Sequence, residues 1–172
     1  MSLLAVTVIG HDRPGIIAQV TGLLAGLGGN LEDSTMTILR GHFAMMLIVS
    51  ARAPAAEVER ALAPVAADGT LLVSVREVPP EPDAAGTGSP YVLTVHGADR
   101  PRIVSSVTGV VADVGGNITD LTTRLAGDLY LLVAEVDLPR SADPAALGER
   151  LREVAAELGV DVSLRPAEAD VL

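Results

Sequence analysis

Residues 7–46 read TVIGHDRPGIIAQVTGLLAGLGGNLEDSTMTILRGHFAMM, and the same chain contains a second version of this stretch. Residues 94–133, TVHGADRPRIVSSVTGVVADVGGNITDLTTRLAGDLYLLV, align with the first without a gap at a constant offset of 87 (94 minus 7). Asp-Arg-Pro, Val-Thr-Gly and Gly-Gly-Asn occupy matching positions in both copies. A repeat of this length is too long for a solenoid unit and suits a small globular domain. The sequence therefore predicts two copies of one domain, each with its own core.

Hydropathy periodicity predicts the same order of elements in both copies. Strands are expected in the first copy at 3–9, 31–39, 43–51 and 71–78, with helices that begin at Pro14 and Pro54. In the second copy, strands are expected at 91–96, 118–126, 129–138 and 160–165, and helices at 101–114 and 144–158. Asp143 suits the N-cap of the last helix. The order βαββαβ predicts an α+β class with two ferredoxin-like domains in tandem, each an antiparallel sheet with helices on one face.

The domain boundaries follow from composition. Residues 79–89 have the Pro, Gly and small polar composition of a linker. We therefore expect a first domain at 1–78, a linker at 79–89 and a second domain at 90–172.

The composition narrows the class of protein. The chain has 172 residues, of which 49% are hydrophobic, but it has no Trp, one Phe and two Tyr, so both cores must be aliphatic. It has no Cys, which excludes disulfides and thiolate sites and fits a reducing compartment. The apolar N-terminus lacks a basic region before it, and no apolar run approaches the roughly 20 residues that cross a bilayer. A soluble, cytoplasmic protein without a membrane partner is the expectation.

The charge argues against direct binding of nucleic acid. The formal net charge is -10, and all twelve basic residues are Arg. No segment is basic enough to displace the counterions of a phosphate backbone, so we expect no DNA or RNA partner. The absence of Lys excludes Schiff-base and P-loop lysines.

The turn between the first strand and the first helix carries the main candidate chemistry. A helix start offers unpaired backbone N–H groups to a carboxylate, and Gly15 would let a ligand approach the backbone closely. The amide of Asn30 both donates and accepts hydrogen bonds. This set suits a small zwitterion such as an amino acid. The structural alternative is that Asp12 caps the helix, Arg13 is solvated and Asn30 satisfies backbone groups.

These residues carry a resemblance to a known family. The βαββαβ order, the Asp-Arg-Pro-Gly turn, the Gly-Gly-Asn segment and the duplication resemble the ACT domain, and the whole chain resembles tandem-ACT proteins of the glycine cleavage repressor type. The resemblance implies a regulatory module that binds amino acids at interfaces between paired domains, through the first loop and the start of the second strand. The ligand-binding residues that it implies are His11, Asp12, Arg13, Pro14, Gly15, Ile16 and Asn30 in the first copy and Asp99, Arg100, Pro101, Arg102, Ile103 and Asn117 in the second.

The two copies differ at one position of this turn, where Gly15 is replaced by Arg102. A long cationic side chain there would fill the space for a ligand or would itself reach a carboxylate. We expect the first loop to be the better pocket. Arg102 then either marks a degenerate site or contributes to a shared one.

Other chemistry is weakly indicated. The three His residues are not at metal-ligand spacing, and no Gly-rich loop matches a nucleotide-binding pattern, so neither a metal nor a cofactor is expected. The leading hypothesis is a non-enzymatic amino-acid sensor that controls an unidentified protein partner, such as a transcriptional regulator or a metabolic enzyme. The alternatives are a small ferredoxin-like enzyme, such as an acylphosphatase-like phosphohydrolase, and a purely structural association module.

Apolar residues at successive strand positions, as in 3–6 and 44–49, indicate sheets that are apolar on both faces. One face lies under the helices, and the other needs a cover. We therefore expect a homodimer in which the first-loop pockets lie at or near domain interfaces.

Overall fold

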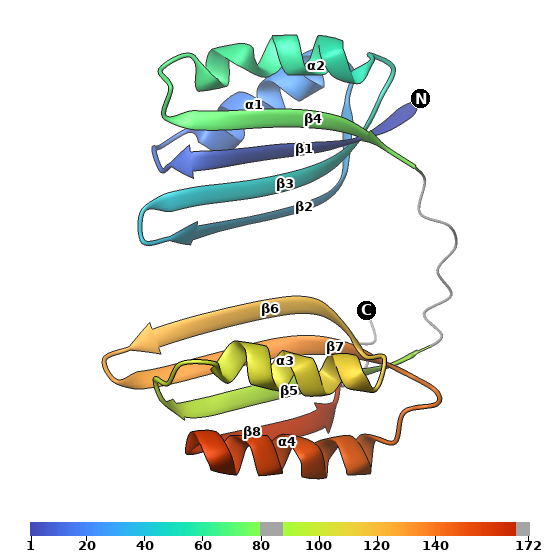
Figure 1. Ribbon diagram of the computed structural model, residues 1–172. Coiled ribbons are helices and arrows are strands. Elements are labelled where there is room, and N and C mark those ends of the chain that lie inside the picture. The colour runs from blue at the N-terminus through green and yellow to red at the C-terminus, as the bar shows by residue number, and fades with distance from the viewer. Residues whose placement is uncertain (80–87, 168–172) are drawn as a thin grey trace. The chain divides into compact units, whose positions relative to one another are not determined.

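The computed structural model describes residues 1–79 and 88–167, which form two compact units, one on each side of residues 80–87 (Figure 1). The predicted linker 79–89 therefore lies mostly outside the described residues. Its last two residues belong to the first strand of unit 2, which begins at Gly88 rather than at Tyr91. None of the described helices is long and apolar enough to span a membrane.

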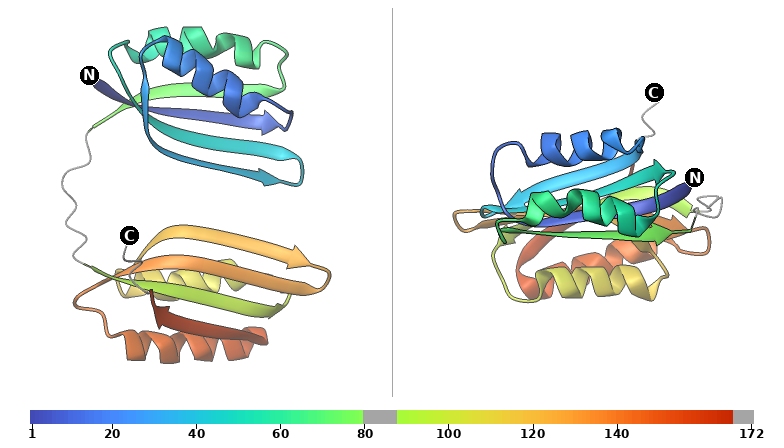
Figure 2. Two further views of the ribbon diagram at one scale, coloured as in Figure 1. Left: turned by 180° about the vertical axis from the view of Figure 1, so that it is seen from behind. Right: turned by 90° about the horizontal axis from the view of Figure 1, so that it is seen from above.

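Unit 1 is a four-stranded antiparallel sheet with its helices on one face, as Figures 1 and 2 show. The strand order across the sheet is β2-β3-β1-β4. Its elements are β1 (Ser2–His11), α1 (Ile16–Gly26), β2 (Asn30–Leu39), β3 (His42–Ala51), α2 (Ala55–Leu62), the 3-10 helix η1 (Ala63–Ala66) and β4 (Leu71–Val78).

Unit 2 repeats this topology with the strand order β6-β7-β5-β8. Its elements are β5 (Gly88–Ala98), α3 (Ile103–Asp113), β6 (Asn117–Ala126), β7 (Leu129–Pro139), α4 (Pro144–Leu158) and β8 (Val160–Pro166). The α+β class, the βαββαβ order and the tandem repeat of a ferredoxin-like domain are thereby confirmed. The bounds of α4 are those predicted.

The helix starts predicted at Pro14 and Pro101 are wrong by two residues. Gly15 and Arg102 adopt left-handed backbone conformations, with φ of 90° and 75°, and a residue in this conformation cannot continue a right-handed helix. Helices α1 and α3 therefore begin after them, at Ile16 and Ile103.

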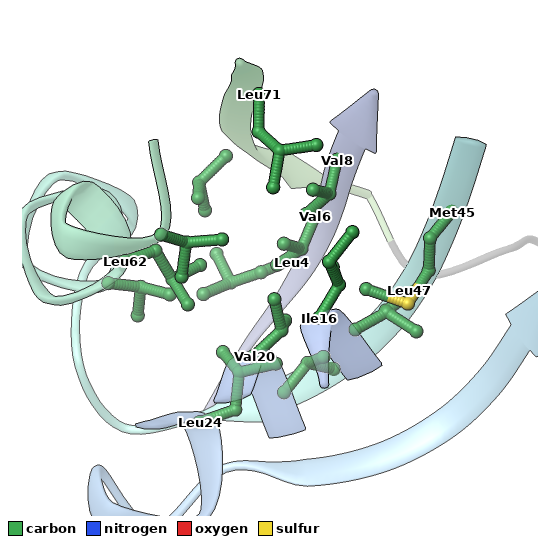
Figure 3. Packing of buried hydrophobic residues seen from close by; sticks show 14 of the residues in the cluster. Leu4, Val6, Val8, Ile16, Val20, Leu24, Met45, Leu47, Leu62 and Leu71 are labelled. Atoms are coloured by element: carbon green, nitrogen blue, oxygen red, sulfur yellow. The ribbon is translucent and has the colours of Figure 1, made fainter. Parts of the chain in front are cut away.

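Each unit buries its own aliphatic core between the helices and one face of the sheet. Strand β1 alternates, so that Leu4, Val6 and Val8 are buried under α1 and α2. Figure 3 shows them packed against Ile16 and other residues of the cluster. The lack of aromatic residues is therefore no obstacle to a closed core, because Leu, Val and Ile interdigitate well across a sheet and its helices.

Both units contain a bulge that the sequence analysis did not predict. The register between β2 and β3 shifts between Leu31 and Asp33, and the register between β6 and β7 shifts between Ile118 and Asp120. The extra residues, Glu32 and Thr119, occupy matching positions of the repeat. After each bulge the alternation of the strand is displaced by one residue.

Candidate functional site

The loop after β1, which we call loop 1 (residues 11–15), is tied to two other parts of unit 1. The backbone N–H of His11 donates to the carbonyl of Thr70 at 3.0 Å, and that of Asp12 donates to the carbonyl of Gly41 at 3.0 Å. Loop 1 therefore sits where the hairpin β2–β3 and the start of β4 meet the carboxyl end of β1.

The backbone conformation explains why Gly15 is a glycine. A Cβ atom at this position would meet no other atom within 4 Å, so space alone would admit a side chain. The positive φ disfavours one. Arg102 has nearly the same backbone angles, so the turn accommodates an arginine at the cost of strain.

The starts of α1 and α3 have no side-chain cap and no acidic residue in the first turn. Asp12 therefore does not cap α1, which removes that part of the structural alternative. Helix α4 is different, because Asp143 Oδ1 accepts from the N–H groups of Ala145 at 2.9 Å and Ala146 at 3.3 Å. The predicted cap of α4 is confirmed. The first-turn N–H groups of α1 and α3 remain available to an acceptor from outside.

Arg13 is bound within unit 1 rather than solvated. Its Nη2 donates to Oε1 of Gln19 at 3.0 Å and to the carbonyl of Val65 at 3.3 Å, and its Nε lies 3.9 Å from Oδ2 of Asp68. Hydrogen bonds from the backbone N–H and the hydroxyl of Thr70, with a smaller effect of Arg13, hold the pKa of Asp68 below its ordinary value of 3.8. Arg13 thus links loop 1 to α1 and to the segment before β4.

Loop 2 (residues 99–102) borders a hollow of about 260 Å³ at the start of α3. Four of the predicted site residues line it: Asp99, Arg100, Arg102 and Ile103. Arg100 and Arg102 are exposed, and within the described residues neither guanidinium takes part in an ion pair. The hollow therefore combines two cationic groups, a carboxylate and the uncapped start of a helix.

Three further residues line the same hollow and were missed by the sequence analysis: Val104, Ser105 and Tyr130. Tyr130 matches Phe43 in the repeat, at the offset of 87. Phe43 is buried in the core, whereas Tyr130 is half-buried and carries a hydroxyl. The replacement of Phe43 by Tyr130 between the copies is the sequence signal that would have identified this residue.

A larger hollow, of about 520 Å³, lies beside loop 1 but contains none of its predicted ligand residues. It is lined by Ile9, Gly10, Leu39, His42, Phe43, Ala44, Gly69, Thr70, Leu71 and Leu72. The rings of His11 and His42 meet edge to face at its margin, with centroids 6.4 Å apart.

Asn30 and Asn117 lie far from the loops of their own units. Asn30 pairs with Ser50, which pairs with Leu3, eight residues before His11 on β1. At about 3.3 Å per residue, Asn30 is thus roughly 26 Å from the loop end of β1. In unit 2, Asn117 pairs with Asp137, and Asp137 pairs with Pro90 near the start of β5. Asn117 is therefore equally far from Ala98, where β5 ends and loop 2 begins. The expected meeting of helix start and amide does not occur within a unit.

Comparison with known proteins identifies relatives of both the halves and the whole. The chain is 26% identical to the glycine cleavage system transcriptional repressor of Escherichia coli over 169 residues, which cover 94% of this chain and 88% of the repressor. A UPF0237 protein of Methanopyrus kandleri is 42% identical over 72 residues, covering 41% of this chain and 80% of that protein.

Two solved structures match this chain over nearly its whole length. The crystal structure of an unknown protein from Galdieria sulphuraria matches with a TM-score of 0.82 and 30% identity, over 96% of this chain and 98% of that one. The structure of a putative glycine cleavage system transcriptional repressor matches with a TM-score of 0.71 over 95% of this chain and 96% of that one, and at 19% identity it supports the fold alone. The ACT domain family matches twice, at residues 2–76 and 89–165. The chain therefore belongs to the ACT-domain family, with one copy of the domain in each unit.

Proposed function

We propose that this chain is an amino-acid-binding regulatory protein that acts through a protein partner and catalyses no reaction itself. Its relation to a transcriptional repressor over nearly the whole chain supports a regulatory role. With a net charge of -10, the protein would influence transcription indirectly, through a protein that itself contacts DNA.

The hollow at the start of α3 is the observation that carries the proposal. Its volume of about 260 Å³ lies just below the range of pockets for drug-sized ligands, which suits a ligand as small as a single amino acid. The guanidinium of Arg100 or Arg102 would bind the ligand's carboxylate, with support from the first N–H groups of α3. The carboxylate of Asp99 would attract its ammonium group.

Loop 1 is retained as the second candidate site. It shares the left-handed turn and the uncapped helix start, but Arg13 is occupied by Gln19 and Val65, so the N–H groups of α1 would have to carry the carboxylate there. We propose Asn30 and Asn117 as ligand groups only for an assembly in which another copy of the chain supplies them, because of their distance from the loops.

The internal bonds of Arg13 also bear on the enzyme alternative. An acylphosphatase-like enzyme would need this arginine to hold a phosphate, whereas here it holds the chain together. No observation favours that alternative, and its test is the turnover of acetyl phosphate, which we expect to be absent.

A thermal-shift screen against the twenty amino acids tests the proposal. A ligand that binds only the native state at a hundredfold excess over its Kd adds about 2.7 kcal/mol to the free energy of unfolding. Arg102→Gly, which removes the guanidinium and suits the backbone, should abolish the shift if loop 2 is the site. Gly15→Arg probes loop 1 in the same way, and Arg140→Ala, an exposed arginine elsewhere in unit 2, is the control. A shift that survives both loop variants, or no shift with any amino acid, would contradict the proposal.

Indirect action on transcription has its own test. The isolated protein should give no mobility shift with duplex DNA, even at low salt, where nonspecific attraction is strongest. Binding that weakens steeply as salt increases would contradict it.

A further inference from the structure

Unit 1 presents an apolar sheet face on the side away from its helices, which we call the open face. Alternation along the strands places on it Leu3, Ala5, Thr7 and Ile9 of β1, Ala44, Met46, Ile48 and Ser50 of β3, Leu72, Ser74, Arg76 and Val78 of β4, and Asp33, Thr35, Thr37 and Leu39 of β2. Ile9, Met46 and Leu72 are 42%, 46% and 62% exposed. Exposed apolar side chains that gather on one face often mark an interaction site.

Two opposite charges lie at opposite edges of this face and in the same row of the sheet. Arg76 pairs with Ala5, Ala5 pairs with Ile48, and Ile48 pairs with Asp33. Three strand spacings, about 14 Å, separate the two outer residues, so they do not pair within one unit. Among the described residues, neither of them takes part in an ion pair.

We propose that the open face of unit 1 binds the same face of a second copy of this chain, about a two-fold axis parallel to the strands. Rotation about this axis reverses the strand order, so that β2 of one copy lies over β4 of the other, and it leaves the position along the strands unchanged. Asn30 therefore stays at the end of the sheet far from loop 1 in both copies, so this dimer does not bring the Asn30 amide to loop 1. Asp33 of each copy is then opposite Arg76 of the other, at both edges. Packed sheets lie about 10 Å apart, a gap that an arginine reaching a carboxylate can bridge.

The other two-fold axis in the plane of the face does not give this match. An axis across the strands would place each strand over its own copy and would set Arg76 against the uncharged part of β4. The charge pattern therefore selects the axis parallel to the strands.

The size of the face suits such a dimer. Four strands at about 4.8 Å spacing and eight residues at about 3.3 Å give roughly 500 Å² per copy. The two copies together bury roughly 1,000 Å², the lower limit for a specific interface. The row that contains Met46 and Thr7 lies next to the charged row, so the second copy would cover it in this dimer.

The matching face of unit 2 is a poorer occupant. It carries an equivalent edge pair, Asp120 and Arg165, but also Glu135 and Asp137 on its inner strand β7. An apolar sheet laid over β7 would remove water from these two carboxylates, which is costly without new partners. The inner strands of unit 1, β1 and β3, carry no carboxylate on the open face, so pairing two copies of unit 1 avoids this cost.

Charge reversal tests the proposal by analytical ultracentrifugation. Asp33→Arg and Arg76→Asp each place like charges at both edges and should weaken the dimer by at least about tenfold. An equimolar mixture of the two variants should restore wild-type association, because each arginine then meets an aspartate across the interface. Wild-type protein that remains a 17.6 kDa species at micromolar concentration, or a mixture that does not recover, would overturn the proposal.

A matched pair of apolar variants tests which unit forms the interface. Met46→Glu should dissociate the dimer, whereas Val133→Glu, at the matching position of unit 2, should not. Circular dichroism confirms that both variants are folded. Dissociation by Val133→Glu alone would assign the interface to unit 2 and overturn the proposal.

Discussion

The two units are alike on the helix side of their sheets and different on the open side. On the helix side, buried apolar residues occupy matching positions, such as Val20 and Val107 in the first helix of each unit. On the open side, Met46 of unit 1 lies beside uncharged residues, whereas unit 2 has Glu135 and Asp137 on the corresponding inner strand. The core requires apolar residues in any unit of this fold, whereas the open face is constrained only by what covers it.

The loops differ in the same way. Gly15 and Arg102 share a backbone conformation, but in unit 1 Arg13 is bound internally, whereas in unit 2 Arg100 and Arg102 border a hollow. The two loops thus share a backbone framework, but loop 1 is held to the rest of its unit by Arg13, whereas loop 2 exposes two cationic groups.

The comparison of cores gives the largest expected effect. Leu62→Ala and Leu151→Ala should each lower the free energy of unfolding of their own unit by about 2–5 kcal/mol, because both side chains are fully buried. Both tyrosines, Tyr91 and Tyr130, lie in unit 2, so tyrosine fluorescence follows unit 2, while circular dichroism follows both units. Exposed Glu59→Ala is the control. If tyrosine fluorescence reports the same loss of unfolding free energy for Leu62→Ala and for Leu151→Ala, the two cores are not independent.

The comparison of turns gives a smaller effect of opposite sign in the two units. Gly15→Arg should destabilise unit 1 by about 1–2 kcal/mol, and Arg102→Gly should stabilise unit 2 by a similar amount, because only the glycine adopts the left-handed conformation without strain. Denaturant unfolding measures both changes. A destabilising Arg102→Gly would mean that the arginine side chain makes contacts that outweigh the strain.

The comparison of helix starts predicts an effect at α4. Asp143→Ala should lower the stability of unit 2 by about 1 kcal/mol, because it removes the acceptor for the N–H groups of Ala145 and Ala146. Asp143→Asn keeps a side-chain acceptor and should retain most of the stability. Identical losses in both variants would indicate that the charge, rather than the cap, matters.

The smallest expected effect is a pH dependence confined to unit 1. The pKa of Asp68 in the folded state is below its ordinary value of 3.8. The ionised carboxylate therefore stabilises unit 1 above about pH 3.8, and this stabilisation is lost as the pH falls through the folded-state pKa. Asp68→Asn should therefore be less stable than wild type at about pH 5, and the difference should shrink towards about pH 2. Circular dichroism of both proteins across this range measures it. A difference that grows on acidification would contradict the assignment.

Much of the fold was predictable because it depends on local patterns. The strands of both copies and the cap at Asp143 follow from periodicity and capping chemistry, and the structure contains each of them. The starts of α1 and α3 were predicted two residues too early, because proline suits both the first turn of a helix and the turn before it. The left-handed residue that follows each proline is what prevents the helix from beginning there.

The sequence by itself determined the duplication, the order of elements and the residues of the two loops, because these are properties of spacing along the chain. Only the tertiary structure decided that Arg13 binds Gln19 and Val65, that Tyr130 joins the hollow of loop 2, and that Asn30 lies at the far end of the sheet. It also decided that Asp33 and Arg76 share a row across four strands. The physical reason is that strand register, which the sequence does not state, brings together residues that are far apart in the chain.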